Sequence, residues 1–100
     1  MNTISVASLK ARLANGEKVN LLDVREPDER AVFNIGGYFI PLGDILTMRT
    51  DEIEELKNEE IICYCRSGKR SMQASMMMET MGFANMVNLE GGMLAWESNT

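Results

Sequence analysis

The chain has 100 residues, which is enough for one domain with a single hydrophobic core and too few for two. Hydrophobic residues make up 45% and charged residues 25%, as in ordinary globular proteins, and the net charge of −5 argues against a general nucleic-acid or anionic-membrane surface. The absence of histidine excludes catalysis and zinc sites that depend on imidazole. We therefore expect one domain over residues 1–100, with no metal and no cofactor.

The same sequence carries signs of its cellular compartment. No apolar run approaches the length of about 18 to 20 residues that a membrane span needs, and the first residues lack the charged-then-apolar pattern of a signal sequence. Cys63 and Cys65 are the 2 cysteines of the chain, and they stand too close together on an extended segment for an unstrained disulfide. Unpaired cysteines suit a reducing compartment, so we expect a cytoplasmic protein.

In chain order, the first third predicts alternating strands and helices. Residues 4–14 indicate a short extended piece followed by a capped helix, and the apolar run 19–24 indicates a buried strand. Asp23 and Arg25 stand at the carboxyl end of that strand, where open α/β sheets build their sites. Pro27 then favours the first turn of a short helix.

The middle of the chain predicts short elements and one acidic surface. Residues 39–42 indicate a short strand, 43–48 a helical turn, and 51–56 a helix with acids in its first turn, as the helix dipole favours. The acidic run is interpreted as a solvated face, with a docking surface for a basic partner as the alternative. Its members are Glu52, Glu54, Glu55, Glu59 and Glu60.

The run 61–72 carries the chemistry. Residues 61–64 predict a buried strand, Gly68 permits the positive φ of a tight turn, and Ser71 is a good N-cap for the helix that follows. Cys65 then lies at the carboxyl end of a strand and faces the N-terminus of a helix. The unpaired N–H groups and partial positive charge of such a terminus favour an anion.

Three cations lie close to this cysteine: Arg66, Lys69 and Arg70. Together with the helix start, they should lower the pKa of Cys65 from about 8.5 toward the thiolate, which is the nucleophilic form. The alternative is a buried structural cysteine before a basic turn, but three cations and a glycine this close to a cysteine are rarely buried in a hydrophobic core. Asp23 and Arg25 either form a polar wall beneath this loop, with Asp23 pairing with a loop cation, or form a solvated turn with a local ion pair.

The helix after the loop is predicted from about Arg70 to Met81, with Gly82 just past its end. Its buried stripe is expected to contain Ala74, Met77, Met78 and Met81. Met72 and Met76 fall on the opposite face, where they form either a weak docking patch for a partner protein or ordinary isolated surface residues. A last strand over 86–89 and a closing helix follow, and the closing helix should pack Met93, Leu94 and Trp96 on the sheet.

The loop that follows the predicted strand is Cys65-Arg66-Ser67-Gly68-Lys69-Arg70. It resembles the six-position active loop of the single-domain members of the rhodanese family of sulfurtransferases. Other stretches similar to landmarks of that family, in the same order, are Leu21-Leu22-Asp23-Val24-Arg25-Glu26, Pro41-Leu42, Gly82-Phe83, and Asn88-Leu89-Glu90-Gly91-Gly92 with Trp96. The largest departure is Asn34-Ile35-Gly36-Gly37-Tyr38, where many members carry His-Ile-Pro-Gly-Ala. The resemblance implies an α/β fold: a single rhodanese-like domain whose central, mainly parallel five-stranded sheet has helices on both faces.

The resemblance also implies an activity. The Cys65 thiolate would take sulfane sulfur from thiosulfate, a polysulfide or a persulfide and hold it as a persulfide. It would then pass the sulfur to a thiol, to cyanide or to a protein acceptor. The implied substrate-binding residues are Arg66, Ser67, Gly68, Lys69 and Arg70. The implied supporting residues are Asp23, Arg25 and Ser71.

Three alternatives stay open. A thiolate phosphatase or arsenate reductase also holds an oxyanion in an amide cradle, but the phosphatase loop has five residues between Cys and Arg, whereas four separate Cys65 from Arg70. A non-catalytic recognition module would commonly lack the cysteine or the loop cations. A sulfur carrier would serve one partner protein and turn over small donors poorly. The donor, the acceptor, the pathway, the oligomeric state and the role of Cys63 are not determined by the sequence.

Overall fold

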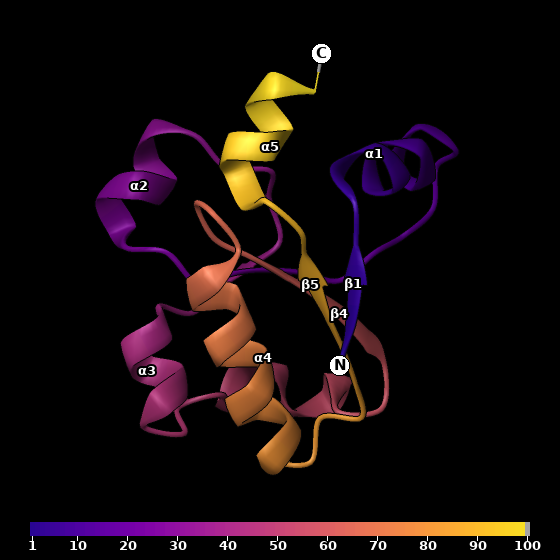
Figure 1. The fold of residues 1–100 in the computed structure, drawn as a ribbon. Helices are drawn as coiled ribbons and strands as arrows, with labels where there is room; N and C mark the ends of the chain where they lie inside the picture. Colours follow the sequence, from indigo (N-terminus) through magenta and orange to yellow (C-terminus); the bar gives the residue numbers. More distant parts are fainter. Residues whose placement is uncertain (100) are drawn as a thin grey trace.

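A computed structural model describes residues 1–99, and its strands form one five-stranded parallel sheet in the order β1-β5-β4-β2-β3 (Figure 1). The strands are β1 (Asn2–Ile4), β2 (Leu21–Asp23), β3 (Tyr38–Phe39), β4 (Glu60–Tyr64) and β5 (Asn85–Leu89). Strand β4 is central, with Cys63 opposite Leu22 of β2 and Asn88 of β5. The carboxyl ends of these strands therefore meet at one edge of the sheet, where the residues after Tyr64 lie.

Helices cover both faces of the sheet. They are α1 (Val6–Ala14), α2 (Pro27–Val32), α3 (Leu42–Leu46), the 3-10 helix η1 (Asp51–Leu56), α4 (Lys69–Thr80) and α5 (Gly92–Ser98). Helices α1 and α5 contribute to the apolar cluster on one face, whereas α3, η1 and α4 contribute to the cluster on the other (Figure 1). The predicted α/β fold is confirmed, and the sheet is parallel throughout. No helix within residues 1–99 has the length and apolar character needed to cross a membrane.

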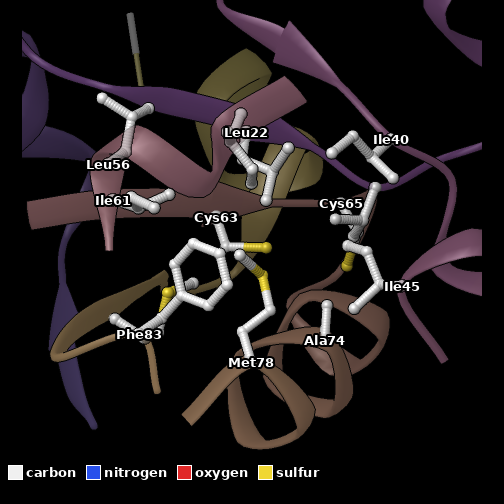
Figure 2. Close-up of a cluster of buried hydrophobic side chains, with 13 residues drawn as sticks. Leu22, Ile40, Ile45, Leu56, Ile61, Cys63, Cys65, Ala74, Met78 and Phe83 are labelled. Atoms are coloured by element: carbon white, nitrogen blue, oxygen red, sulfur yellow. The ribbon is translucent and has the colours of Figure 1, made fainter. Parts of the chain in front are cut away.

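The alternation of side chains along β4 decides where Cys65 points. Ile62 and Tyr64 pack on the face of α1 and α5, whereas Ile61, Cys63 and Cys65 pack on the face of α4. Figure 2 shows both cysteines among the apolar side chains on the α4 side of the sheet. Because β4 ends at Tyr64, the Cys65 side chain lies at the edge of this core, beneath the first turn of α4.

Helix α4 begins earlier than the sequence predicted. Its N-cap is Gly68, which has φ 98, and its first residue is Lys69, so the prediction of Ser71 as the N-cap was wrong. The left-handed conformation of Gly68 lets the chain turn into the helix at once. Ser71 consequently falls in the first helical turn, where it is buried.

The faces of α4 agree with the prediction, whereas the closing helix differs from it in part. Ala74 and Met78 are buried, Met77 and Met81 pack against the same cluster, and Met72 and Met76 are exposed. In α5, Met93 is buried and Trp96 packs against the core, but Leu94 is 45% exposed. Leu94 therefore does not pack on the sheet as expected.

The segment that departs from the family pattern forms an ordered turn. The Asn34 side chain accepts from the Gly36 N–H at 2.9 Å and donates to the Arg30 carbonyl at 3.1 Å. The Tyr64 hydroxyl donates to the Gly36 carbonyl at 3.0 Å, which ties this turn to the end of β4. Gly37 has φ 84 and approaches Leu21 so closely that a side chain would not fit.

Candidate active site

The Cys65 sulfur lies inside the turn that joins β4 to α4. The backbone N–H groups of Gly68 and Ser71 point at Sγ, with distances of 3.1 and 3.3 Å from nitrogen to sulfur. The Ser71 hydroxyl oxygen lies 3.5 Å from the same sulfur. The sulfur therefore points into the curled segment and is surrounded by hydrogen-bond donors, as an anion requires.

Helix α5 holds the first peptides of this loop in place. The N–H of Met93 donates to the Cys65 carbonyl at 2.9 Å, and the N–H of Leu94 donates to the Arg66 carbonyl at 3.0 Å. In a trans peptide the C=O and the following N–H point in opposite directions. The Ser67 N–H thus faces away from α5 and toward Cys65, where it helps to lower the pKa of the thiol.

These contacts change the proton affinity of the thiol. Burial alone would raise the pKa of Cys65, but hydrogen bonds from the Ser71 hydroxyl and from the N–H groups of Ser71, Gly68 and Ser67 lower it below the ordinary value of 9.0. Cys63, two residues earlier on the same face, lacks such a cradle, and burial raises its pKa. The site therefore favours the thiolate at Cys65 and disfavours it at Cys63.

The loop covers the sulfur. Cys65 has no exposed surface, whereas Arg66 and Ser67 are exposed. Contact between the sulfur and a donor therefore requires the residues around Cys65 to move. Two hollows flank the loop: one of about 400 Å³ beside Arg66 and Arg25, and one of about 590 Å³ beside Ser67 and Lys69.

The three loop cations differ in their partners. Arg70 makes a double hydrogen bond to the Glu29 carboxylate of α2, at 2.7 and 2.8 Å. This pairing lowers the pKa of Glu29 to about 2 and raises the pKa of Arg70. Within residues 1–99, Arg66 and Lys69 take part in no ion pair. Two cations thus remain available to an anionic ligand, while Arg70 ties the loop to α2.

Asp23 pairs with its own strand end and not with the loop. Its buried carboxylate accepts from Arg25 Nε and Nη2, both at 2.9 Å, and from Arg30 Nη1 at 3.2 Å. The expected pairing of Asp23 with a loop cation was therefore wrong, and Glu29 takes that role. The local Asp23–Arg25 ion pair is present, but it is buried rather than solvated. Arg25 lines the same hollow as Arg66, which places it beside the loop.

Sequence reasoning gave no role to three residues that contact the loop: Glu29, Asn88 and Gly92. Glu29 is also part of a capping box with Glu26, which is the ordinary reason for an acid at that helical position. Asn88 is buried and hydrogen-bonds both Gly68 and Ser71. A polar residue inside the last strand was the signal for Asn88, whereas no pattern in the sequence marks Glu29 as a partner of Arg70. No group of three metal-ligating side chains lies together in the described part of the chain.

Residues 5–99 match the family model for the rhodanese-like domain. A sulfurtransferase of Allochromatium vinosum is 38% identical over 96 residues, which cover 96% of this chain and 88% of that protein. The human thiosulfate:glutathione sulfurtransferase is 27% identical, with 94% of this chain and 91% of that protein covered.

Among solved structures, a rhodanese-like domain protein from Staphylococcus aureus superimposes with a TM-score of 0.83. Its sequence is 31% identical, and the alignment covers 96% of this chain and 91% of that chain. Both the family model and these relatives extend over almost the whole sequence, including the loop around Cys65. The chain belongs to the rhodanese-like domain family, whose relatives named here support sulfur transfer as its general activity.

Proposed function

We propose that the protein is a sulfurtransferase in which Cys65 is the nucleophile. The thiolate would attack the outer sulfur of thiosulfate, forming a new S–S bond while the S–S bond of the donor breaks and sulfite departs with the electron pair. An acceptor thiolate or cyanide would then attack the outer sulfur of the Cys65 persulfide, and Cys65 would leave as the thiolate again. The amide cradle around Sγ is the observation that carries this proposal.

The loop would bind and stabilise the negative charges of this exchange. Arg66 and Lys69, which have no ion-pair partner within residues 1–99, would attract an anionic donor such as thiosulfate, a polysulfide or a persulfide. The backbone N–H groups of Ser67 and Gly68 would hold the charge on sulfur. Arg70 would contribute less, because it already shares its charge with Glu29.

The remaining residues would support the loop. Ser71 donates its N–H to the Cys65 sulfur, and its hydroxyl oxygen lies 3.5 Å from that sulfur. Asp23 and Arg25 would stiffen the neighbouring wall through their buried ion pair. The relative named for thiosulfate and glutathione supports thiosulfate as a donor and a thiol as an acceptor. We further propose that residues 1–100 act as one domain in a reducing compartment such as the cytoplasm, since both cysteines are free.

A turnover assay tests the proposal. Purified protein is given thiosulfate and cyanide, and thiocyanate is measured; a polysulfide replaces thiosulfate in a second series. We expect Cys65→Ser to lose all turnover and Cys63→Ser, the matched control two residues earlier in the chain, to keep it. Equal turnover by wild type and Cys65→Ser would overturn the mechanism. Hydrolysis of an aryl phosphate that vanishes in Cys65→Ser would favour the phosphatase alternative instead.

A protein acceptor would dock beside the loop. Met72 and Met76 are 43% and 55% exposed and line the 590 Å³ groove that begins at Ser67 and Lys69. Flexible thioethers suit an adaptable contact. The double variant Met72→Glu with Met76→Glu should keep transfer to cyanide and lose transfer to protein thiols. Unchanged transfer to protein and small-molecule acceptors alike would remove the docking role.

A further inference from the structure

Asn88 on β5 is a buried polar residue in contact with the cradle. It is 3% exposed, and both polar ends of its side chain reach the turn around Cys65. Nδ2 donates to the Gly68 carbonyl at 3.2 Å, and Oδ1 accepts a short hydrogen bond from the Ser71 hydroxyl. Gly68 and Ser71 are the same residues whose N–H groups donate to the Cys65 sulfur. Asn88 therefore lies directly behind the sulfur site.

The Gly68 carbonyl decides which way the Asn88 amide faces. A carbonyl oxygen only accepts hydrogen bonds, so the NH₂ group of Asn88 faces Gly68, and the side-chain oxygen must face Ser71. The Gly68 oxygen also accepts from the Met72 N–H at 3.1 Å, so both of its lone pairs are occupied. The Ser71 hydroxyl also lies 3.2 Å from this oxygen. Of its two neutral acceptors, the Asn88 side-chain oxygen is the better one, because the Gly68 oxygen already has two donors.

The Ser71 hydroxyl has one proton and three acceptors within reach: the Asn88 side-chain oxygen, the Gly68 carbonyl and the Cys65 sulfur. While Cys65 is a neutral thiol, its S–H can donate to the Ser71 oxygen and the Ser71 proton can stay on Asn88. Once Cys65 is a thiolate, the charged sulfur becomes the stronger acceptor, because hydrogen bonds to charged groups are about twice as strong as neutral ones. The hydroxyl then turns toward sulfur, and the buried Asn88 oxygen loses its donor, which is costly.

We propose that Asn88 is a positioning residue that acts on Cys65 through Ser71, because its side-chain oxygen competes with the Cys65 sulfur for the single Ser71 proton. The competition keeps the thiolate from being overstabilised. A thiolate that is held too strongly is a weaker nucleophile, since nucleophilicity falls as the thiol becomes more acidic. This consequence rests on the proposed function, in which Cys65 attacks a sulfur donor.

The competition predicts the direction in which the midpoint of Cys65 ionisation shifts when Asn88 is replaced. Without Asn88, the Ser71 proton has two acceptors left, the neutral Gly68 carbonyl and the Cys65 sulfur. The charged sulfur is the stronger of the two, so Asn88→Leu should lower the midpoint of Cys65 ionisation. The size is that of one neutral hydrogen bond, which corresponds to about half to one pH unit. A residue that only braced the loop would do the opposite. Its loss would loosen the N–H donors and raise the midpoint.

The charged groups near Cys65 are the same in the wild type and in Asn88→Leu. The titratable and charged groups on the loop and on the elements packed around it include Asp23 on β2 and Arg25 just after it, Glu29 on α2, Cys63 on β4, Arg66, Lys69 and Arg70 on the loop and α4, Glu90 just after β5, and Glu97 on α5. None of them is hydrogen-bonded to Asn88 within residues 1–99. A midpoint shift on changing Asn88 therefore reports the Ser71 proton and not a lost charge.

The experiment is a thiolate titration in a double-mutant cycle. Ultraviolet absorbance of the thiolate is followed against pH in a Cys63→Ala background, so that Cys65 is the one thiol observed. We expect Asn88→Leu to lower the midpoint by about half to one pH unit when Ser71 is present and to leave it unchanged in Ser71→Ala. The double variant replaces both hydrogen-bond partners by apolar groups, which is the best-tolerated change.

Two results would overturn the proposal: a midpoint that rises in Asn88→Leu, or the same shift with and without Ser71. Asn88→Ala is titrated in parallel and decides the question if Asn88→Leu does not fold, with circular dichroism as the check of folding. The titration uses no sulfur donor. Failure of sulfur transfer with the predicted titration would therefore reject the proposed function alone, and the converse result would reject the role of Asn88 alone.

Discussion

Replacing Gly92 with alanine perturbs the contact between α5 and the loop of Cys65. A Cβ atom at position 92 would lie 2.4 Å from the Cys65 carbonyl oxygen and 2.7 Å from the Arg66 carbonyl carbon and oxygen. An ordinary carbon–oxygen approach is about 3.3 Å or more, so the loop carbonyls would have to retreat by about 1 Å. A retreat of this size would break the hydrogen bonds that these carbonyls accept from Met93 and Leu94.

Two costs add in this variant. Alanine in the left-handed conformation of Gly92, at φ 55, costs about 1–2 kcal/mol. Overpacking against backbone costs about 1–3 kcal/mol more. We therefore expect the free energy of unfolding, measured by urea denaturation, to fall by about 2–5 kcal/mol. Gly16→Ala is the matched control: its φ is 77 and nothing lies within 4 Å of a Cβ there, so it carries the first cost alone.

The sulfur site should change as well. When the Arg66 carbonyl moves, the Ser67 N–H turns away from Cys65, and the loss of one hydrogen bond to a charged sulfur is worth about 1.5–3 kcal/mol. The pKa of Cys65 should rise by about one to two units, and turnover at neutral pH should fall because less of the thiolate is present. A folded Gly92→Ala protein with the thiolate midpoint and turnover of Gly16→Ala would refute this reasoning.

Three further results are expected. Cys63→Ala should leave the thiolate absorbance at neutral pH unchanged, because burial raises the pKa of Cys63 and the thiolate at that pH belongs to Cys65; a loss of absorbance would reverse this assignment. Sulfur loading of the wild type should rise with pH and have its midpoint below pH 9.0, since the reactive form is the deprotonated one and hydrogen bonds lower its pKa; a midpoint at or above that pH would count against the cradle. Glu29 has a pKa lowered from 4.5 to about 2 by Arg70, so its pairing stabilises the fold above pH 4.5 and is lost as pH falls toward 2. In Glu29→Gln the free energy of unfolding should therefore be about 1 kcal/mol lower at neutral pH and show a smaller decrease on acidification; parallel curves for the two proteins would contradict this.

The sequence predicted the architecture because the signals for it are local. Apolar runs end at glycines and caps, and strands and helices alternate, so a parallel sheet covered on both faces was expected and is present. The placement of Cys65 at the end of a buried strand followed from the apolar run before it. The faces of α4, with Ala74 and Met78 buried and Met72 and Met76 exposed, followed from helical spacing.

The contacts around the loop were not predictable in the same way. One of the two interpretations paired Asp23 with a loop cation, but Arg25, two residues away at the same strand end, hydrogen-bonds the Asp23 carboxylate instead. Glu29 meets Arg70 across 41 positions of sequence, and no local pattern encodes such a distance. Ser71 was interpreted as a cap, but Gly68 turns the chain three residues earlier and moves the Ser71 hydroxyl into the sulfur site.

The most direct test of the account is the intact mass of the protein after each half-reaction. Incubation with thiosulfate should add the mass of one sulfur atom to the wild type and nothing to Cys65→Ser, and a later addition of cyanide should remove that mass. A wild type that gains no sulfur from thiosulfate or polysulfide, or a Cys65→Ser variant that gains it equally, would contradict the claim that the loop holds Cys65 as the sulfur-accepting thiolate.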